Sequence, residues 1–282
     1  MIEKNKRFCI VGLGLLGGSY AKGLKEKGYI VDAIDLNEES IHYACENHLI
    51  DSGSTHCEEL LPHADYVILG LYPTLIVEWI KTNQYLLKEN VFITDVSGVK
   101  RAIVEDVQAI LRDDLEFIAS HPMAGREVSG VKFSNTEMFK VANFIITPTA
   151  QNTPQGIAFV NDLAQLLEFK RITTLTCEEH DKMIGFLSQL THVIAVTLMN
   201  TNDNSHLVEY TGDSFRDLTR IAKINENLWS ELFLLNKDYL LEEIDDFMKE
   251  LSHFRDTLYN DDTEEMKRLF IQSTNRRKYF DQ

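Results

Sequence analysis

The strongest constraint in this sequence is a short apolar run near the N-terminus that breaks into regularly spaced glycines. Residues 8–11 predict a buried strand, and residues 19–27 predict a helix. The glycines between them fit the spacing G-x-G-x-x-G, which permits a tight turn, a close approach to a pyrophosphate and close packing of helix on strand. Free N–H groups at the helix start would face the phosphates. We therefore predict a dinucleotide-binding loop formed by Gly12, Leu13, Gly14, Leu15, Leu16 and Gly17.

An acidic residue follows the second predicted strand, residues 29–34. Asp35 stands eighteen residues after Gly17, where a carboxylate accepts hydrogen bonds from an adenine ribose. A 2′-phosphate beside Asp35 would meet like charge, and residues 36–39 supply no arginine to receive it. The sequence therefore predicts NAD, rather than NADP, as the cofactor.

Composition limits the classes of partner and compartment. A chain of 282 residues is long enough for two domains, and its formal net charge of −16 argues against nucleic acid or an anionic membrane as partner. Four cysteines occur without a C-x-x-C pair or a metal-ligand spacing, so we predict reduced thiols and no metal site. Because we find no uninterrupted apolar run of about 18 residues, we expect a soluble, cytoplasmic protein.

Strands and helices alternate through the first 176 residues. This alternation predicts a Rossmann-type, doubly wound parallel sheet whose ligands bind beyond the carboxyl ends of the strands. Tyr72, Ser97 and His121 each follow one of these strands closely, and we expect Tyr72 to contact the cofactor. The further strands are predicted at residues 66–70, 91–94, 116–119, 143–147 and 171–176, and the further helices at 38–47, 74–86, 99–112 and 155–168.

Beyond residue 176 the pattern becomes helical, with no convincing strand. Apolar residues recur at spacings of three and four along residues 183–198 and again along residues 240–258. Such stripes are typical of a helix core, but together they exceed what one thin helical layer can cover. We therefore predict an NAD-binding domain at 1–176 and an all-α domain at 177–282 that forms a homodimer.

His121 is the clearest candidate for a catalytic group. It lies at the ligand-bearing edge of the predicted sheet, before the small residues Ala124 and Gly125. A neutral imidazole there can accept the proton of a substrate hydroxyl while hydride leaves the same carbon for a nicotinamide. An isolated histidine is more often structural, so the prediction depends on its place at this edge.

Five segments together resemble the prephenate dehydrogenase family of tyrosine biosynthesis, in order along nearly the whole chain. The glycine loop is common to many dehydrogenases, whereas the blocks that begin at His121 and at Phe215 are far more particular. The segments are residues 12–17, Asp95 to Lys100, HPMAGRE with Ser129-Gly130, His180-Asp181 with His192, and FRDLTRIA at 215–222 with Trp229.

The resemblance implies oxidative decarboxylation of prephenate to 4-hydroxyphenylpyruvate, with hydride transfer to NAD. In that family the histidine matching His121 hydrogen-bonds the ring hydroxyl and assists its deprotonation. The resemblance also places Arg220 on a substrate carboxylate, His192 and Trp229 in the pocket, and Glu127 near its entrance.

The segment around Arg220 also suggests a carboxylate clamp by its own pattern. Ser214 and Asp217 fit a helix capping box, and Arg216, Arg220 and Lys223 share one face of the predicted helix. A helix N-terminus with guanidinium groups suits the two carboxylates of prephenate. The competing interpretation is a solvated basic face paired with the excess acids.

Two positions depart from the family pattern. The family usually has Gly-Ser before Val-Lys, with the serine touching the histidine, whereas this chain has Ser97-Gly98. We retain Ser97 as a catalytic candidate, and whether it reaches the same place stays open. The family also commonly has Ser-His-Leu-Pro-His. In this chain Gln189 stands in place of the first histidine of that motif, and His192 corresponds to the second.

Three rival functions remain. Arogenate dehydrogenase differs only in a substrate amine, whose acidic partner would be Asp213 or Glu127. A β-hydroxyacid dehydrogenase would need Lys-x-x-x-Asn, and residues 182–186 lack the asparagine. An NAD-binding sensor without catalysis would explain the departures at Ser97 and Gln189.

Overall fold

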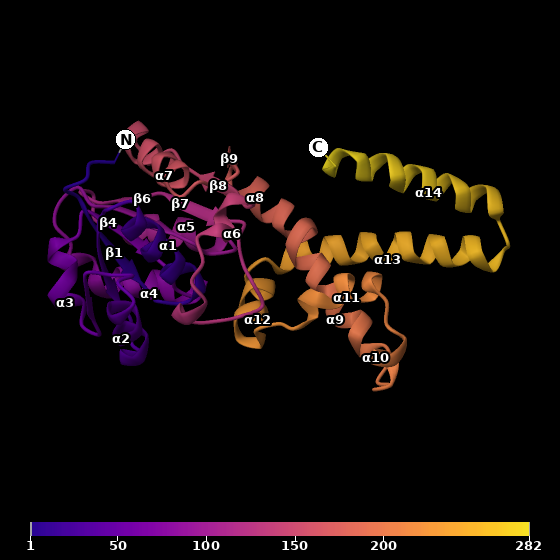
Figure 1. Cartoon of the computed structure of the whole chain (residues 1–282). Helices are drawn as coiled ribbons and strands as arrows, with labels where there is room; N and C mark the ends of the chain where they lie inside the picture. The colour runs from indigo at the N-terminus through magenta and orange to yellow at the C-terminus, as the bar shows by residue number, and fades with distance from the viewer. Residues whose placement is uncertain (1, 282) are drawn as a thin grey trace. The chain divides into compact units, whose positions relative to one another are not determined.

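The computed structural model describes residues 2–281, whose contacts divide them into two compact units with the division between Asn236 and Lys237. The first unit contains both β-sheets and the helices up to α12 (Figure 1). The second unit consists of α13 (Lys237–Tyr259), α14 (Thr263–Arg277) and a short 3₁₀ turn.

A six-stranded parallel sheet forms the centre of the first unit. Its strand order is β3-β2-β1-β4-β5-β6, the order of a doubly wound dinucleotide-binding fold, so the predicted parallel sheet is confirmed. The order in which strands are added reverses between β1 and β4, where such folds leave a crevice for the cofactor. The strands are β1 (Arg7–Val11), β2 (Ile30–Ile34), β3 (Ser52–Ser54), β4 (Tyr66–Leu69), β5 (Phe92–Asp95) and β6 (Glu116–Phe117).

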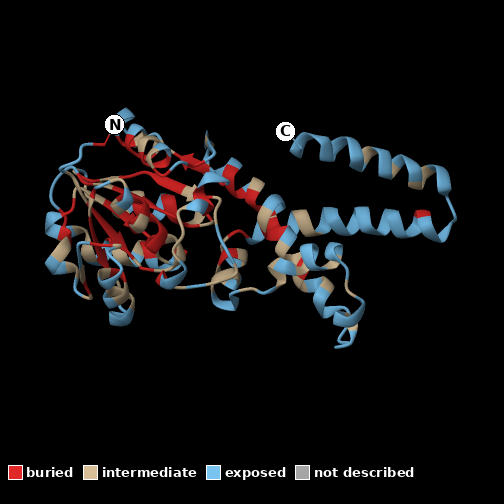
Figure 2. Ribbon diagram, in the orientation of Figure 1, coloured by how far each residue is buried: buried red, intermediate tan, exposed pale blue. Residues whose placement is uncertain are grey.

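Helices cover both faces of this sheet, and the alternation along β1 shows why. Phe8 and Ile10 belong to one buried apolar cluster and Cys9 and Val11 to another, because successive side chains of a strand point to opposite faces. Buried residues are concentrated in this sheet (Figure 2). The helices are α1 (Leu15–Glu26), α2 (Glu38–Glu46), α3 (Cys57–Leu60), α4 (Pro73–Asn83), α5 (Arg101–Ile110), α6 (Glu137–Lys140) and α7 (Pro154–Leu166).

A second, three-stranded sheet was not anticipated. It consists of β7 (Ala119–Pro122), β8 (Asn143–Thr147) and β9 (Arg171–Thr174), with β7 antiparallel to β8 and β8 parallel to β9. The single strand predicted at residues 116–119 is therefore wrong, because β6 ends at Phe117. After Ile118, the Ser120 N–H donates to the side chain of Asp95 at 3.1 Å, so the ladder with β5 is interrupted and β7 pairs with β8 instead.

The glycine loop is as tight as its spacing predicts. Gly12 has φ +94°, and a Cβ at Gly17 would lie 1.9 Å from the Gly12 carbonyl oxygen. A Cβ at Gly14 would meet nothing within 4 Å, so the backbone there is open to a ligand. The helix begins at Leu15 rather than at residue 19 as predicted, and its N-cap Gly14 leaves the first turn without a side-chain cap.

One long helix follows the second sheet. It comprises α8 (Cys177–Ile184), a π-helical turn (Gly185–Leu190) and α9 (Thr191–Asn200), and it begins with a capping box between Thr176 and Glu179. Among residues 2–281 it is the one helix long and apolar enough to cross a membrane by length and composition. Polar residues such as Asp181 and Lys182 interrupt its apolar sequence, so the absence of a continuous apolar run did not reveal it.

Short helices complete the first unit: α10 (Leu207–Tyr210), α11 (Asp213–Thr219), a 3₁₀ turn (Arg220–Ala222) and α12 (Glu226–Leu235). The predicted capping box of Ser214 and Asp217 is wrong. The N-cap of α11 is Gly212, which places Ser214 inside the first turn, and α11 ends before Arg220.

The second unit exposes much of its apolar surface (Figure 2). Within it, the rings of Phe254 and Phe270 lie 6.1 Å apart and His253 pairs with Glu265 across the two helices. The stripe predicted along residues 240–258 is nonetheless largely exposed at Phe247, Leu251 and Leu258. An apolar face of this kind is typical of a surface that another protein chain covers.

The loop geometry predicts different effects for two glycines. Gly17→Ala is expected to lower the free energy of unfolding by about 1–3 kcal/mol, because the new methyl group would overlap the Gly12 carbonyl. Gly14→Ala is the matched control: it should cost less than about 1 kcal/mol but weaken NAD binding, since its methyl group occupies the open space. Urea unfolding followed by circular dichroism, together with NAD titration, measures both. Equal losses of stability would contradict this account of the loop.

Candidate active site

Asp35 lies at the end of β2 and is held beside the glycine loop. Its carboxylate accepts hydrogen bonds from the Leu13 N–H at 2.5 Å and the Asn37 N–H at 2.8 Å. The open backbone at Gly14 and the uncapped first turn of α1 lie in the same loop. These features fit the pyrophosphate and ribose of a dinucleotide, with donors supplied by the backbone and an acceptor by Asp35.

His121 lies within β7, at the point where the two sheets meet. Its neighbour Ser120 is buried and fixed to the end of β5, since its hydroxyl bonds to Thr94 and to the Asp95 carbonyl, both at 2.9 Å. Pairing of His121 with Ile145 of β8 holds the other side of the strand. The imidazole is thus carried on rigid backbone at the carboxyl end of the main sheet.

The imidazole of His121 is the first member of a chain of three side chains. Its Nδ1 lies 2.8 Å from Nε2 of His180, and Nδ1 of His180 lies 2.7 Å from Oδ1 of Asp181. His180 and Asp181 are fully buried in α8. Burial, with additional effects of His180 and Lys100, holds the pKa of His121 well below its usual value, so this imidazole is neutral near pH 7.

Asp181 also caps the start of α5. Its two oxygens accept hydrogen bonds from the backbone N–H groups of Lys100 and Arg101, at 2.8 and 2.7 Å. The Lys100 ammonium lies 2.6 Å from Asp95 Oδ2, and both side chains are fully buried. Sequence reasoning assigned no role to Lys100 or Asp181, although both belong to segments that resemble the family.

Ser97 is placed differently from the family serine. Its buried hydroxyl donates to the Val99 carbonyl at 3.2 Å, and its N–H donates to Asp95. The neighbouring Gly98 occupies the place beside the histidine, since a Cβ there would lie 3.8 Å from His121 Nε2. Within residues 2–281 the structure therefore does not bring the Ser97 hydroxyl to His121.

A second cluster gathers four of the predicted substrate residues. The rings of His192 and Trp229 are stacked with centroids 3.6 Å apart, and Arg220 forms an ion pair with Glu127. Burial, together with Arg220, lowers the pKa of His192, while the Ser188 carbonyl and Glu127 act in the opposite direction. Glu127 and Arg220 therefore lie close enough to His192 to influence its charge.

Arg216 does not join this cluster. It is exposed and pairs with Asp213 one turn earlier in α11, whereas Arg220 lies in the following 3₁₀ turn. The two arginines therefore have different carboxylate partners. Tyr72 is at the N-cap of α4, where its hydroxyl lies 3.3 Å from Nδ2 of Asn225.

Helix α12 connects the two clusters. It carries Trp229 beside His192 and Leu232 beside Gly98. Buried Gln189 of the π-helical turn donates to the Leu232 carbonyl at 2.9 Å and accepts from Asn236 at 2.8 Å. The glutamine that departs from the family pattern thus anchors α12, which sequence reasoning could not show.

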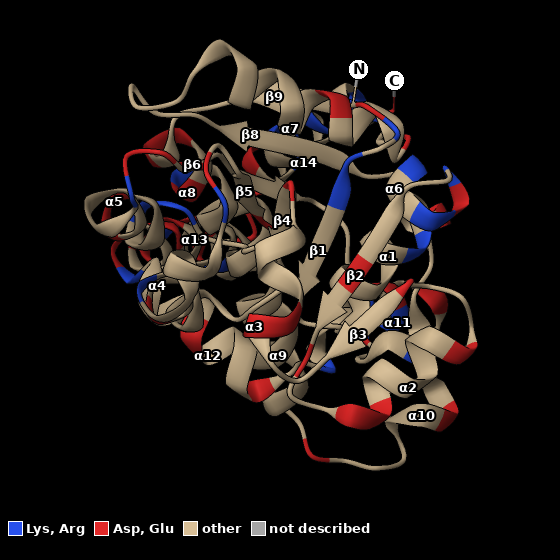
Figure 3. Ribbon diagram, turned by 90° about the vertical axis from the view of Figure 1, so that its left-hand side faces the viewer, with Lys and Arg blue, Asp and Glu red and all other residues tan. Residues whose placement is uncertain are grey.

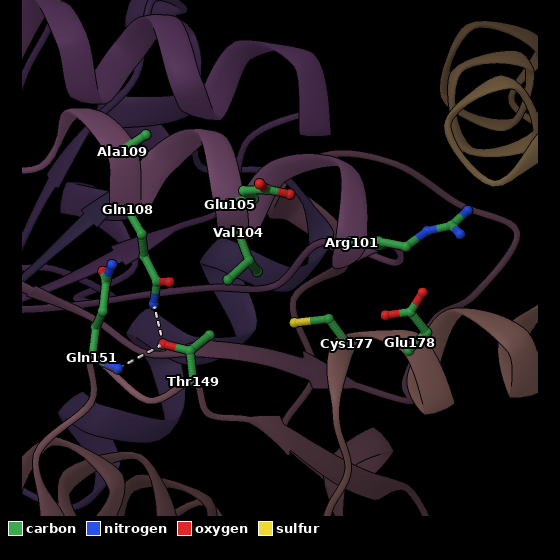
Figure 4. Close-up of a pocket in the computed structure, with 9 residues that line it drawn as sticks. All are labelled: Arg101, Val104, Glu105, Gln108, Ala109, Thr149, Gln151, Cys177 and Glu178. Atoms are coloured by element: carbon green, nitrogen blue, oxygen red, sulfur yellow. Dashed lines mark hydrogen bonds between the residues drawn. The ribbon is translucent and has the colours of Figure 1, made fainter.

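Acidic surface helices and one surface depression lie away from the predicted site residues. Acidic residues lie on surface helices such as α3 and α10 (Figure 3). A surface depression of about 320 Å³ lies between α5 and the start of α8 (Figure 4). Its lining includes Gln108, Thr149 and Cys177 but neither His121 nor any residue predicted for the site.

Two domain models of one known family match most of the chain. The nucleotide-binding domain of prephenate dehydrogenase matches residues 20–172, and the prephenate dehydrogenase dimerization domain matches residues 176–272. The chain belongs to the prephenate dehydrogenase family. It is an oxidoreductase of this family, and its cofactor is NAD, as the sequence predicts.

Similar proteins cover nearly the whole chain. Prephenate dehydrogenase of Bacillus subtilis is 26% identical over 96% of this chain and 75% of its own length. Cyclohexadienyl dehydrogenase of Zymomonas mobilis is 29% identical over 95% of this chain and 94% of its own length. The crystal structure of prephenate dehydrogenase from A. aeolicus, with hydroxyphenyl propionate and NAD⁺, covers 99% of this chain and 100% of its own, with 29% identity and a TM-score of 0.90.

The buried ion pair below the site yields a stability prediction. Lys100→Met is expected to lower the free energy of unfolding by about 3–5 kcal/mol, because Asp95 would keep a buried charge without its partner. The matched control is Lys249→Met, which removes a solvent-exposed pair with Asp246 and should leave the free energy of unfolding nearly unchanged. Urea unfolding of the two variants measures the difference, and equal effects would show that the buried pair contributes little.

Proposed function

We propose that this protein catalyses the oxidative decarboxylation of prephenate to 4-hydroxyphenylpyruvate, with hydride transfer to NAD. The observation that carries the proposal is the His121 imidazole, which contacts His180 through Nδ1 and whose Nε2 lies on the side of Gly98. Residues 1–176 form the NAD-binding domain and residues 177–282 the substrate and dimerisation domain. This protein therefore acts in tyrosine biosynthesis.

His121 is the general base in this mechanism. Its Nε2 accepts the proton of the ring hydroxyl, and its lowered pKa keeps the ring unprotonated and able to do so near neutral pH. NAD supplies the hydride acceptor. Loss of carbon dioxide aromatises the ring, which leaves the protein mainly the tasks of orientation and deprotonation.

Arg220 binds a substrate carboxylate in this proposal. It is paired with Glu127, so an incoming carboxylate would replace Glu127 as its partner. His192 and Trp229 stack on each other beside this pair and form a flat wall for the substrate ring. The crystallised A. aeolicus relative holds an aromatic propionate, which supports a site of this shape.

The apolar surfaces of the helical region support a homodimer. Phe186, Leu187 and Met199 of the long helix are exposed in the single chain, as are Leu251 and Leu258 of α13. Exposed apolar area of this extent favours a second copy of the chain as its cover. We propose that the protein works as a cytoplasmic homodimer.

Arogenate is the alternative substrate. Glu127 and Asp213, the acids that could receive its ammonium group, are each paired with an arginine before substrate binds. If a carboxylate displaces Glu127 from Arg220, however, the released Glu127 could pair with the ammonium group. The choice between the two substrates therefore depends on one contact.

Turnover tests the proposal directly. The wild-type protein should form NADH, measured by its absorbance, with prephenate and NAD but not with arogenate or with NADP. The His121→Ala variant should lose about 10²–10⁴-fold in kcat with little change in NAD affinity, as expected for loss of a general base.

Other outcomes separate the rivals. Preference for arogenate would replace the substrate and leave the mechanism at His121. NAD binding without turnover of either substrate would favour the sensor, and normal turnover by His121→Ala would exclude His121 as the base.

The role of Arg220 predicts a change in KM. Arg220→Gln should raise KM for the substrate by about 10- to 100-fold, because a charge-assisted hydrogen bond contributes about 1.5–3 kcal/mol. The matched control Arg216→Gln, on the exposed face of α11, should leave KM unchanged. Steady-state kinetics measures both variants, and equal increases in KM would restore the two-arginine clamp that the sequence suggested.

A further inference from the structure

The hydrogen-bond chain behind His121 determines where its protons lie. Both oxygens of the Asp181 carboxylate accept hydrogen bonds from backbone N–H groups, those of Lys100 and Arg101, so the carboxylate acts as an acceptor. Nδ1 of His180 must then carry the proton that it donates to Asp181 Oδ1. In neutral His180 this leaves Nε2 unprotonated, and Nε2 is the atom that faces His121.

The same reasoning extends one residue further. Because Nε2 of His180 is an acceptor, Nδ1 of His121 must be the donor across the 2.8 Å contact. In neutral His121 the remaining nitrogen, Nε2, then carries a lone pair. This is the nitrogen that faces Gly98, where a Cβ would lie 3.8 Å away from it.

We infer that His180 and Asp181 are positioning residues that hold His121 in its Nδ1–H tautomer, with an unprotonated Nε2 available to the substrate hydroxyl. The part played in catalysis rests on the proposed function, whereas the tautomer does not. His180 and Asp181 contact neither substrate nor cofactor in this mechanism and act only through His121. In the opposite tautomer Nε2 would carry a proton and could not accept another.

The fold holds the His121–His180–Asp181 hydrogen-bond chain in place from several sides. His180 and Asp181 are fully buried, and Asp181 is fixed by the first N–H groups of α5. Their helix is anchored in turn, because Nδ2 of Asn236 donates to the Asp181 carbonyl at 2.9 Å. The positions of both members are therefore set by elements on each side of them.

The charged groups around the chain favour neutral imidazoles. Lys100 opposes a positive charge on both histidines, and burial acts in the same direction and more strongly. Asp181 and Asp95 oppose this effect at His180, whose pKa is nonetheless lowered. Both rings are thus neutral near pH 8. Each then carries a single N–H, whose position defines the tautomer.

Nuclear magnetic resonance can read the tautomer. The full chain, labelled with ¹⁵N at histidine and saturated with NAD, would be examined at pH 8 by long-range ¹H–¹⁵N correlation. The His121 signals are assigned by their loss in His121→Gln. The wild-type protein should show the Nδ1–H tautomer of His121, and an Nε2–H tautomer would overturn the inference even without further variants.

Two variants at position 180 separate positioning from simple structural support. His180→Gln keeps an acceptor at the place of Nε2 and should retain the Nδ1–H tautomer. His180→Leu removes the acceptor and should convert His121 to a mixture of tautomers. An unchanged tautomer in folded His180→Leu, verified by NAD binding, would overturn the inference.

Kinetics provides a second readout. His180→Leu should lower kcat by about 10- to 100-fold, less than complete loss of a general base, with KM for NAD unchanged, and His180→Gln should recover most of the rate. A fall in kcat without a change of tautomer would show a structural role only. The Nδ1–H tautomer in a protein that oxidises neither prephenate nor arogenate would refute the proposed function and leave the tautomer assignment intact.

Discussion

The arrangement of the site depends on the hydrogen bonds that the Asp181 carboxylate accepts. This carboxylate joins the start of α5, in the nucleotide-binding region, to α8 in the helical region, and it orients the imidazole behind His121. A buried carboxylate is stable only when donors surround it. Since its donors come from two regions of the chain, the geometry at His121 exists only when both regions are folded together.

Other charges in the site are also compensated internally. The Lys100 and Asp95 side chains neutralise each other without access to solvent, and Arg220 is paired with Glu127. A chain with a net charge of −16 can accept an anionic cofactor and substrate because local donors, rather than overall charge, face them. Backbone N–H groups at the glycine loop serve the cofactor, and Arg220 is the cation available to the substrate.

The two departures from the family pattern have different physical explanations. Gln189 takes a structural place, where its amide bonds to the Leu232 carbonyl and to Asn236 and so fixes α12. The exchange at Ser97 and Gly98 removes a side chain from beside His121 and turns the remaining hydroxyl toward Val99. His121 consequently depends on its other neighbour, His180, for orientation.

The sequence by itself determined the parallel sheet, the glycine loop, Asp35 and the helical character beyond residue 176, because these follow from local spacing and periodicity. It also indicated His121, because this residue closely follows a predicted strand, although the structure places it within β7. Only the tertiary structure decided the separate second sheet, the different partners of Arg216 and Arg220, and the partners of His121. These depend on side chains far apart in the chain, such as Asp95 with Ser120 and Asp181 with Lys100, whose contacts leave no periodic trace in the sequence.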